Sequence, residues 1–117
     1  MPNPDYYGNT TSPGIRTVDL NRVDSPQQIG YASLNAADSA VQRIRQDANL
    51  SVVIDTIGYF GGTEQPDEAW LKRIANDHSS PDYDPAKPRG VFVMAPTTAQ
   101  LNDAFMKVAS EILRLAM

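Results

Sequence analysis

Ser51-Val52-Val53-Ile54-Asp55-Thr56-Ile57-Gly58-Tyr59-Phe60-Gly61-Gly62 is a short apolar run, rich in β-branched residues, that ends in glycines. Val52, Val53, Ile54 and Ile57 leave no alternation of polar and apolar positions. A strand of this kind is normally covered on both faces, as in a parallel sheet with helices above and below it. The run therefore predicts a buried strand of an α/β protein.

A second apolar run, residues 90–95, is ended by Pro96. Three segments with apolar residues at helical spacing alternate with the two runs, namely about 33–48, 66–78 and 97–117. The order helix, strand, helix, strand, helix predicts a parallel crossover. We expect an α/β fold with a partial doubly wound, Rossmann-like parallel sheet.

Both long helical segments have an expected cap and an expected buried stripe. Ser33 is the expected N-cap of the first, and Thr97 with Gln100 forms a capping box for the last. The first stripe, expected to pack on the sheet, comprises Leu34, Ala37, Val41, Ile44 and Ala48. The last stripe, expected in the core, comprises Leu101, Phe105, Val108, Ile112 and Leu115.

Residues 1–30 are rich in proline, glycine and other turn formers. They predict an irregular arm or loop, with a brief strand over residues 15–20. An arm of this length is unusual inside a compact domain and is typical of a functional loop, a linker or a piece of a larger structure. Residues 31–117 then form the C-terminal portion of an α/β domain.

Two strands make a poor parallel sheet. Sheets usually have about five strands, and a parallel pair leaves apolar, unpaired edges that invite pairing with another chain. Ordering the backbone and side chains opposes folding by roughly 1.5 kcal/mol per residue, and three helices on two strands bury little area to offset it. We therefore expect this chain to be the C-terminal half of a larger domain, or to associate to complete its sheet.

Composition excludes several classes of protein. The apolar fraction of 41% and charged fraction of 21% are those of a globular protein. The net charge of −4 and the absence of a basic stripe argue against nucleic-acid partners. The chain has no cysteine, hence no disulfide or thiolate metal site, and no apolar run of the roughly 20 residues that a membrane span needs. No signal peptide is visible in the sequence.

Asp55 and the glycine-rich turn at 58–62 are the first candidates for chemistry. A buried carboxylate needs a partner, so Asp55 either accepts a hydrogen bond near the end of the sheet, which we favour, or belongs to a site. Glycines between a strand and a helix resemble a phosphate-binding loop, but neither nucleotide-binding pattern is present. We expect a plain strand-to-helix turn.

His78 is the only histidine and lies between Asp77, Ser79, Ser80 and Asp82 in sequence. Nucleophile, base and orienting acid must converge in space, and neighbours along a loop mostly point apart. We therefore expect a solvated or capping histidine and no catalytic residues.

Two pairs of segments resemble von Willebrand factor type A domains. Residues 53–59 and 67–77 are similar to the late strand and following helix of that family, and 90–95 and 101–115 to its last strand and helix. Among these domains, the chain most resembles the TadE/TadG-like proteins of tight-adherence pilus assembly. The resemblance covers roughly residues 33–117.

The resemblance implies a doubly wound sheet with a metal-ion-dependent adhesion site at its top. That site requires an Asp-x-Ser-x-Ser loop, which the sequence lacks, and Asp38-Ser39-Ala40 does not fit it. The acidic residues Asp82 and Asp84 also lack the spacing of a calcium loop. We expect no metal site and no cofactor in this chain.

These observations favour a non-enzymatic protein-interaction or adhesion module, a partial type A-like domain of a cell-surface or pilus-assembly protein. The resemblance alone implies an extracytoplasmic place in the cell envelope. The expected partner is another protein, the missing N-terminal half of the domain, or a second copy at an exposed sheet edge. The alternatives are half of an α/β enzyme or regulatory domain, with its site near the C-terminal end of strand 51–58, and a truncated chain without a function of its own.

Overall fold

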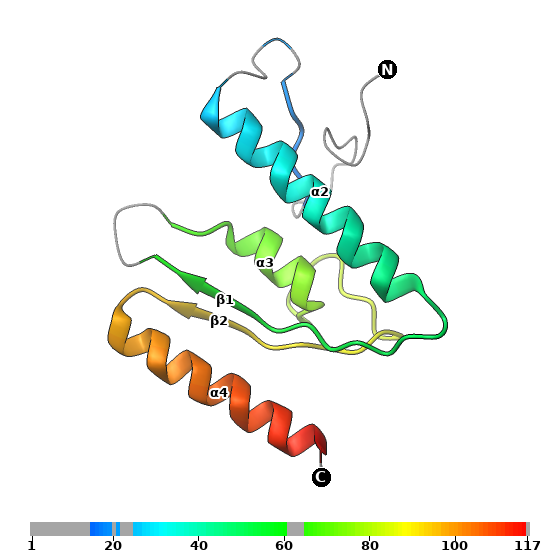
Figure 1. Ribbon diagram of the computed structural model, residues 1–117, viewed down its shortest axis with the longest axis vertical. Coiled ribbons are helices and arrows are strands. Elements are labelled where there is room, and N and C mark those ends of the chain that lie inside the picture. Colours follow the sequence, from blue (N-terminus) through cyan, green and yellow to red (C-terminus); the bar gives the residue numbers. More distant parts are fainter. Residues whose placement is uncertain (1–14, 20, 22–24, 61–64, 117) are drawn as a thin grey trace. The chain divides into compact units, whose positions relative to one another are not determined.

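The computed structural model describes residues 15–19, 21, 25–60 and 65–116. The chain divides into two compact units, Met1–Val52 and Val53–Met117, and each is described by itself. Helix α2 lies in the first unit; β1, α3, β2 and α4 follow in that order in the second (Figure 1). The predicted order helix, strand, helix, strand, helix is confirmed.

Helix α2 spans Pro26–Gln46 and begins seven residues before the predicted start. Ser25 is the N-cap, because its hydroxyl accepts a hydrogen bond from the Gln28 N–H at 3.2 Å, and Pro26 occupies the first turn. The prediction of Ser33 as the cap was wrong because Pro26 was assigned to the turn-rich arm. In the structure, Ser33 is inside the helix and donates to the Ile29 carbonyl.

The buried positions of α2 are polar: Gln28, Asn35, Asp38 and Arg45. The Asn35 amide exchanges two hydrogen bonds with the Arg16 backbone, and Gln28 accepts one from the Asp19 N–H. These side chains hold residues 15–19, which form no strand, against the prediction. The predicted apolar stripe is not a buried face, since Ala37 and Ile44 are exposed.

Strand β1, Thr56–Tyr59, pairs in parallel with β2, Phe92–Ala95, with Thr56 opposite Phe92 and Tyr59 opposite Ala95. The parallel pairing confirms the prediction, but β1 begins five residues later than the apolar run. Residues 51–55 could join the sheet only by pairing with the segment just before β2. That segment is bonded to α3 instead, because the Gly90 N–H donates to the Ala75 carbonyl. The stretch before Thr56 consequently lies outside the sheet, and Val53 is exposed.

Helices α3, Glu68–Ala75, and α4, Thr98–Ala116, contact opposite faces of this sheet (Figure 1). Thr56 faces α3, because its hydroxyl donates to the Leu71 carbonyl at 2.9 Å. Tyr59 faces the other side, and its hydroxyl lies 3.3 Å from the Thr98 hydroxyl at the start of α4. Side chains of odd- and even-numbered residues point to opposite faces of a strand, so α3 covers the face of Thr56 and α4 covers the face of Tyr59. The second unit therefore has three layers, helix, sheet and helix.

Helix α3 begins two residues after the predicted Pro66, with Asp67 as N-cap accepting from the Trp70 N–H at 3.1 Å. It ends at Asn76, whose φ of 54° and ψ of 44° are left-handed. The last helical residue is Ala75, just before the predicted end at residues 76–78. A left-handed residue directly after a helix is a common way to end it, and asparagine tolerates that conformation.

Helix α4 is capped by Thr97 as predicted, with its hydroxyl 3.2 Å from the Gln100 N–H. Its buried contact with the sheet centres on Ala104, and Leu101 and Val108 are half-buried. The prediction that the whole stripe is core was wrong, because Phe105 and Ile112 are 59% and 55% exposed. No helix in the described part of the chain is both long and apolar enough to cross a membrane.

Candidate functional site

A polar hollow of about 230 Å³ opens in the second unit at the end of the sheet where β2 begins. It is lined by Asp77, His78, Arg89, Gly90, Val91, Phe92, Lys107, Glu111 and Arg114. These residues come from the loop after α3, from the start of β2 and from one side of α4. Open α/β sheets usually bind ligands at the opposite, carboxyl end of their strands.

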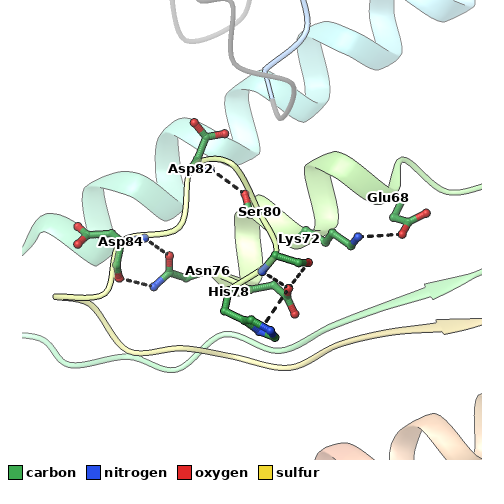
Figure 2. Close-up of polar contacts among 9 residues, drawn as sticks. Glu68, Lys72, Asn76, His78, Ser80, Asp82 and Asp84 are labelled. Carbon is green, nitrogen blue, oxygen red and sulfur yellow. Dashed lines mark hydrogen bonds and ion pairs between the residues drawn. The ribbon is translucent and has the colours of Figure 1, made fainter.

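The loop that forms one wall, residues 77–90, is organised by Asn76. The Asn76 side chain is 2% exposed, and its amide nitrogen lies 2.9 Å from the Asp84 carbonyl, 3.3 Å from the Lys87 carbonyl and 3.2 Å from the Pro88 carbonyl. Its amide oxygen accepts from the Asp84 N–H at 2.9 Å. Figure 2 shows this side chain directed across the loop at Asp84. Residue 76 therefore both ends α3 and fixes the path of the following loop.

Further contacts make this proline-rich loop compact. Arg73 of α3 forms an ion pair with Asp82 at 3.1 Å. Ser80 is buried, donates its N–H to the Asp77 carbonyl and accepts from the Asp82 N–H. The Asp84 carboxylate accepts from the Ala86 N–H at 2.9 Å. The loop is thus an ordered surface element fixed to α3.

Asp77 is held by its neighbour Ser79, whose backbone N–H and hydroxyl donate to the same carboxylate oxygen at 2.8 Å and 2.5 Å. Burial alone raises the pKa of Asp77. The two hydrogen bonds, with the charges of His78 and Lys72, lower it by more, so that the pKa is below its usual value of 3.8. The carboxylate is therefore ionised over the whole neutral range.

These neighbours do not form a catalytic triad. The His78 Nδ1 lies 4.0 Å from Asp77 Oδ1, beyond hydrogen-bond distance, and the imidazole is 69% exposed. The Ser79 hydroxyl is bonded to the carboxylate and not to the imidazole. Figure 2 shows His78 pointing away from Asp82 and Asp84. The expectation that His78 is solvated is confirmed.

Asp55 has the structural role that we favoured. Its carboxylate accepts a hydrogen bond from the Val91 N–H at 2.7 Å, one residue before each strand begins. This bond extends the pairing of the two segments beyond the sheet. Asp55 therefore stabilises the start of the sheet and does not line the hollow.

The glycine-rich turn is described only in part. Gly58 is buried in β1, and a Cβ there would lie 2.7 Å from the Met94 sulfur. Gly61 and Gly62 lie outside the described residues, so the prediction of a plain turn there stays a prediction.

Basic side chains dominate the α4 wall of the hollow. Arg114 pairs with Glu111, with Nη2 2.7 Å from the carboxylate oxygen and Nε 3.3 Å from it. Lys107 lies one turn before Glu111, and Arg89 faces the hollow from the lead-in to β2. The arrangement can bind an anionic group, because guanidinium and ammonium groups are donors only.

Sequence reasoning did not identify Arg89, Lys107 or Asn76. Arg89 and Lys107 are eighteen residues apart and only the parallel fold brings them to one hollow. Asn76 left a signal, since asparagine at a helix end before a loop with three prolines is typical of a left-handed cap.

No group of three or more histidine or acidic side chains that could hold a metal ion occurs among residues with described placement. Comparisons with protein-family models, with curated proteins and with solved structures find no match to this chain.

Proposed function

We propose that this chain is a non-enzymatic protein-interaction module, the C-terminal portion of a doubly wound α/β domain similar to the type A domains of cell-surface or pilus-assembly proteins. The observation that carries the proposal is an apolar stripe on the outer side of α4. Its members are Phe105, Met106, Ala109, Ile112 and Leu113, of which the four large ones are 55–65% exposed. A contiguous exposed patch of this kind is characteristic of an interaction surface.

The stripe is arranged symmetrically about its one small residue. Met106 and Ile112 lie three positions from Ala109, and Phe105 and Leu113 lie four positions from it. Positions three and four apart share one face of a helix, so the small centre allows close approach of a second helix. Two copies of α4 can pack antiparallel across Ala109 in a self-complementary interface.

The sheet offers a second surface for a partner. Thr56 donates its N–H to Val91, and Phe60 donates to Ala95, so these even-numbered residues of the β1 segment point at β2. The backbone groups of Ile57 and Tyr59 therefore point to the other edge of β1, where no strand of the described residues pairs. An added strand, from the rest of a larger domain or from a partner, pairs at such an edge.

Two isoleucines of nearly equal exposure provide a matched test. Ile112, in the stripe, is 55% exposed, and Ile29, on α2, is 54% exposed. We expect the wild-type chain to self-associate as its concentration rises in size-exclusion chromatography with light scattering. Ile112→Asp shifts the association at least tenfold to higher concentration, because it places a charge in the apolar contact. Ile29→Asp leaves the association unchanged.

A wild-type chain that stays monomeric at every concentration would overturn the proposal for this stripe. Equal effects of the two substitutions would also overturn it, because they would indicate a general response to added charge. Far-ultraviolet circular dichroism of both variants checks that the helices are retained.

A further inference from the structure

The hollow at the start of β2 has an excess of positive charge in an acidic protein. Three cationic side chains, Arg89, Lys107 and Arg114, and two carboxylates, Asp77 and Glu111, line it, which leaves one net positive charge with His78 neutral. The chain as a whole carries −4. A local reversal of sign inside a concave surface concentrates ligands of the opposite charge.

Both carboxylates in the hollow already have partners. Asp77 accepts two hydrogen bonds from Ser79, and Glu111 accepts two from Arg114. By contrast, the side chains of Arg89 and Lys107 form no ion pair or hydrogen bond with any residue whose placement is described. The charged groups in the hollow that keep free donors are therefore the two cations Arg89 and Lys107.

The hollow is small and partly open to solvent. A volume of about 230 Å³ is below the range of roughly 300–1,000 Å³ that pockets for drug-sized ligands occupy. The Arg89 guanidinium supplies a planar fork that matches a carboxylate, and Lys107 supplies a point charge. One carboxylate placed between them would balance the single net positive charge of the hollow.

We propose that the hollow binds a carboxylate side chain of an acidic segment in the partner polypeptide, with Arg89 and Lys107 as its ligands. This inference rests on the proposed function, since it names the chemistry of the partner. The hollow and the α4 stripe are separate surfaces: no stripe residue lines the hollow. The acidic segment therefore adds a polar contact at the hollow to the apolar contact that the α4 stripe makes with the partner.

The test is a titration of the isotope-labelled full chain with hexaglutamate, followed by nuclear magnetic resonance. We expect millimolar binding that shifts the signals of Arg89, Lys107 and His78, and that weakens with added salt. Hexaglutamine at matched ionic strength does not bind. Inorganic phosphate is titrated separately and binds at least tenfold more weakly than the peptide.

Lys107→Gln weakens hexaglutamate binding three- to tenfold, because it removes one of the two free cations. Lys87→Gln is the matched control, since Lys87 does not line the hollow, and it leaves binding unchanged. Equal losses in both variants, binding of hexaglutamine, or phosphate binding as tight as that of the peptide would overturn the inference. Self-association through the α4 stripe persists in Lys107→Gln, so failure here is distinguishable from failure of the proposed function.

Discussion

Asn76 combines two requirements that few residues meet together. Its backbone is left-handed, a conformation that asparagine and glycine adopt most readily, and its buried amide bonds to three carbonyls and one N–H of the loop. Glycine would adopt the left-handed backbone, but the loop carbonyls and the Asp84 N–H would lose their hydrogen-bond partner. Alanine would satisfy neither.

Substitution of Asn76 separates the two contributions. We expect Asn76→Gly to lower the free energy of unfolding by about 1–3 kcal/mol, because buried carbonyls lose their donor. Asn76→Ala adds roughly 1 kcal/mol more for the left-handed backbone. Urea titrations followed by the fluorescence of Trp70, the only tryptophan and part of α3, measure both. A glycine variant as stable as the wild type would contradict the assigned role of the amide.

Asp77 gives a dependence of stability on pH. Its pKa in the folded chain lies below the usual 3.8, so the ionised form stabilises the fold above that value. This contribution is lost as the pH falls from 3.8 through the lowered pKa. We expect Ser79→Ala to raise the pKa of Asp77, measured from carboxyl carbon shifts, and to reduce the loss of stability at acidic pH. Ser110→Ala, at an exposed serine of α4 that bonds to Met106, serves as the control.

Single residues differed in how far the sequence could reveal them. Asp55 was placed correctly because a carboxylate beside an apolar strand must find a donor, and the nearest one is the N–H of the paired segment. Arg89 and Lys107 were not found, because each is an ordinary surface cation until the fold places both beside one hollow.

At the scale of elements, the crossing of the chain at Gly90 limits how α3 and the strands pack. A Cβ at Gly90 would lie 1.8 Å from the Ile54 carbonyl oxygen and 2.8 Å from that of Ala75. At Gly58, the nearest atom to a Cβ is the flexible Met94 side chain. The neighbour of Gly90 is a backbone atom, which cannot move without shifting the whole segment, whereas the Met94 side chain can change its conformation.

We therefore expect Gly90→Ala to destabilise the second unit by about 3 kcal/mol or more, and Gly58→Ala by about 1 kcal/mol. Urea unfolding monitored by Trp70 fluorescence checks the order of the two values. If alanine is tolerated better at position 90 than at position 58, the close approach of the Ile54 and Ala75 carbonyls to Gly90 is wrong.

The type and order of the elements were predictable, whereas their boundaries and buried faces were not. Helical spacing and apolar runs located α3, β2 and α4 to within a few residues. The burial of Asn35 and Asp38 in α2 was missed, because apolar periodicity assumes that a helix buries its apolar side. The same assumption placed Phe105 in the core, although it is mostly exposed.

At the scale of the molecule, few apolar residues are buried among those that the structure describes. In the described part of the second unit they are Ile74, Ala75, Ala95 and Ala104, and no large side chain is fully buried. Burying apolar area contributes about 25 cal/mol per Å², so this core stabilises the unit only weakly. A partner that covers the α4 stripe would add buried area and hence stability.

The melting temperature of the second unit should accordingly rise with protein concentration. Association that involves only the folded chain stabilises it by mass action, by about 2.7 kcal/mol when the partner is at one hundred times its Kd. Thermal unfolding monitored at Trp70 over a hundredfold range of concentration measures the shift. We expect Ile112→Asp to shift this dependence at least tenfold to higher concentration and Ile29→Asp to leave it unchanged, because only Ile112 belongs to the stripe. A melting temperature independent of concentration in the wild-type chain would mean that a second copy does not cover this surface.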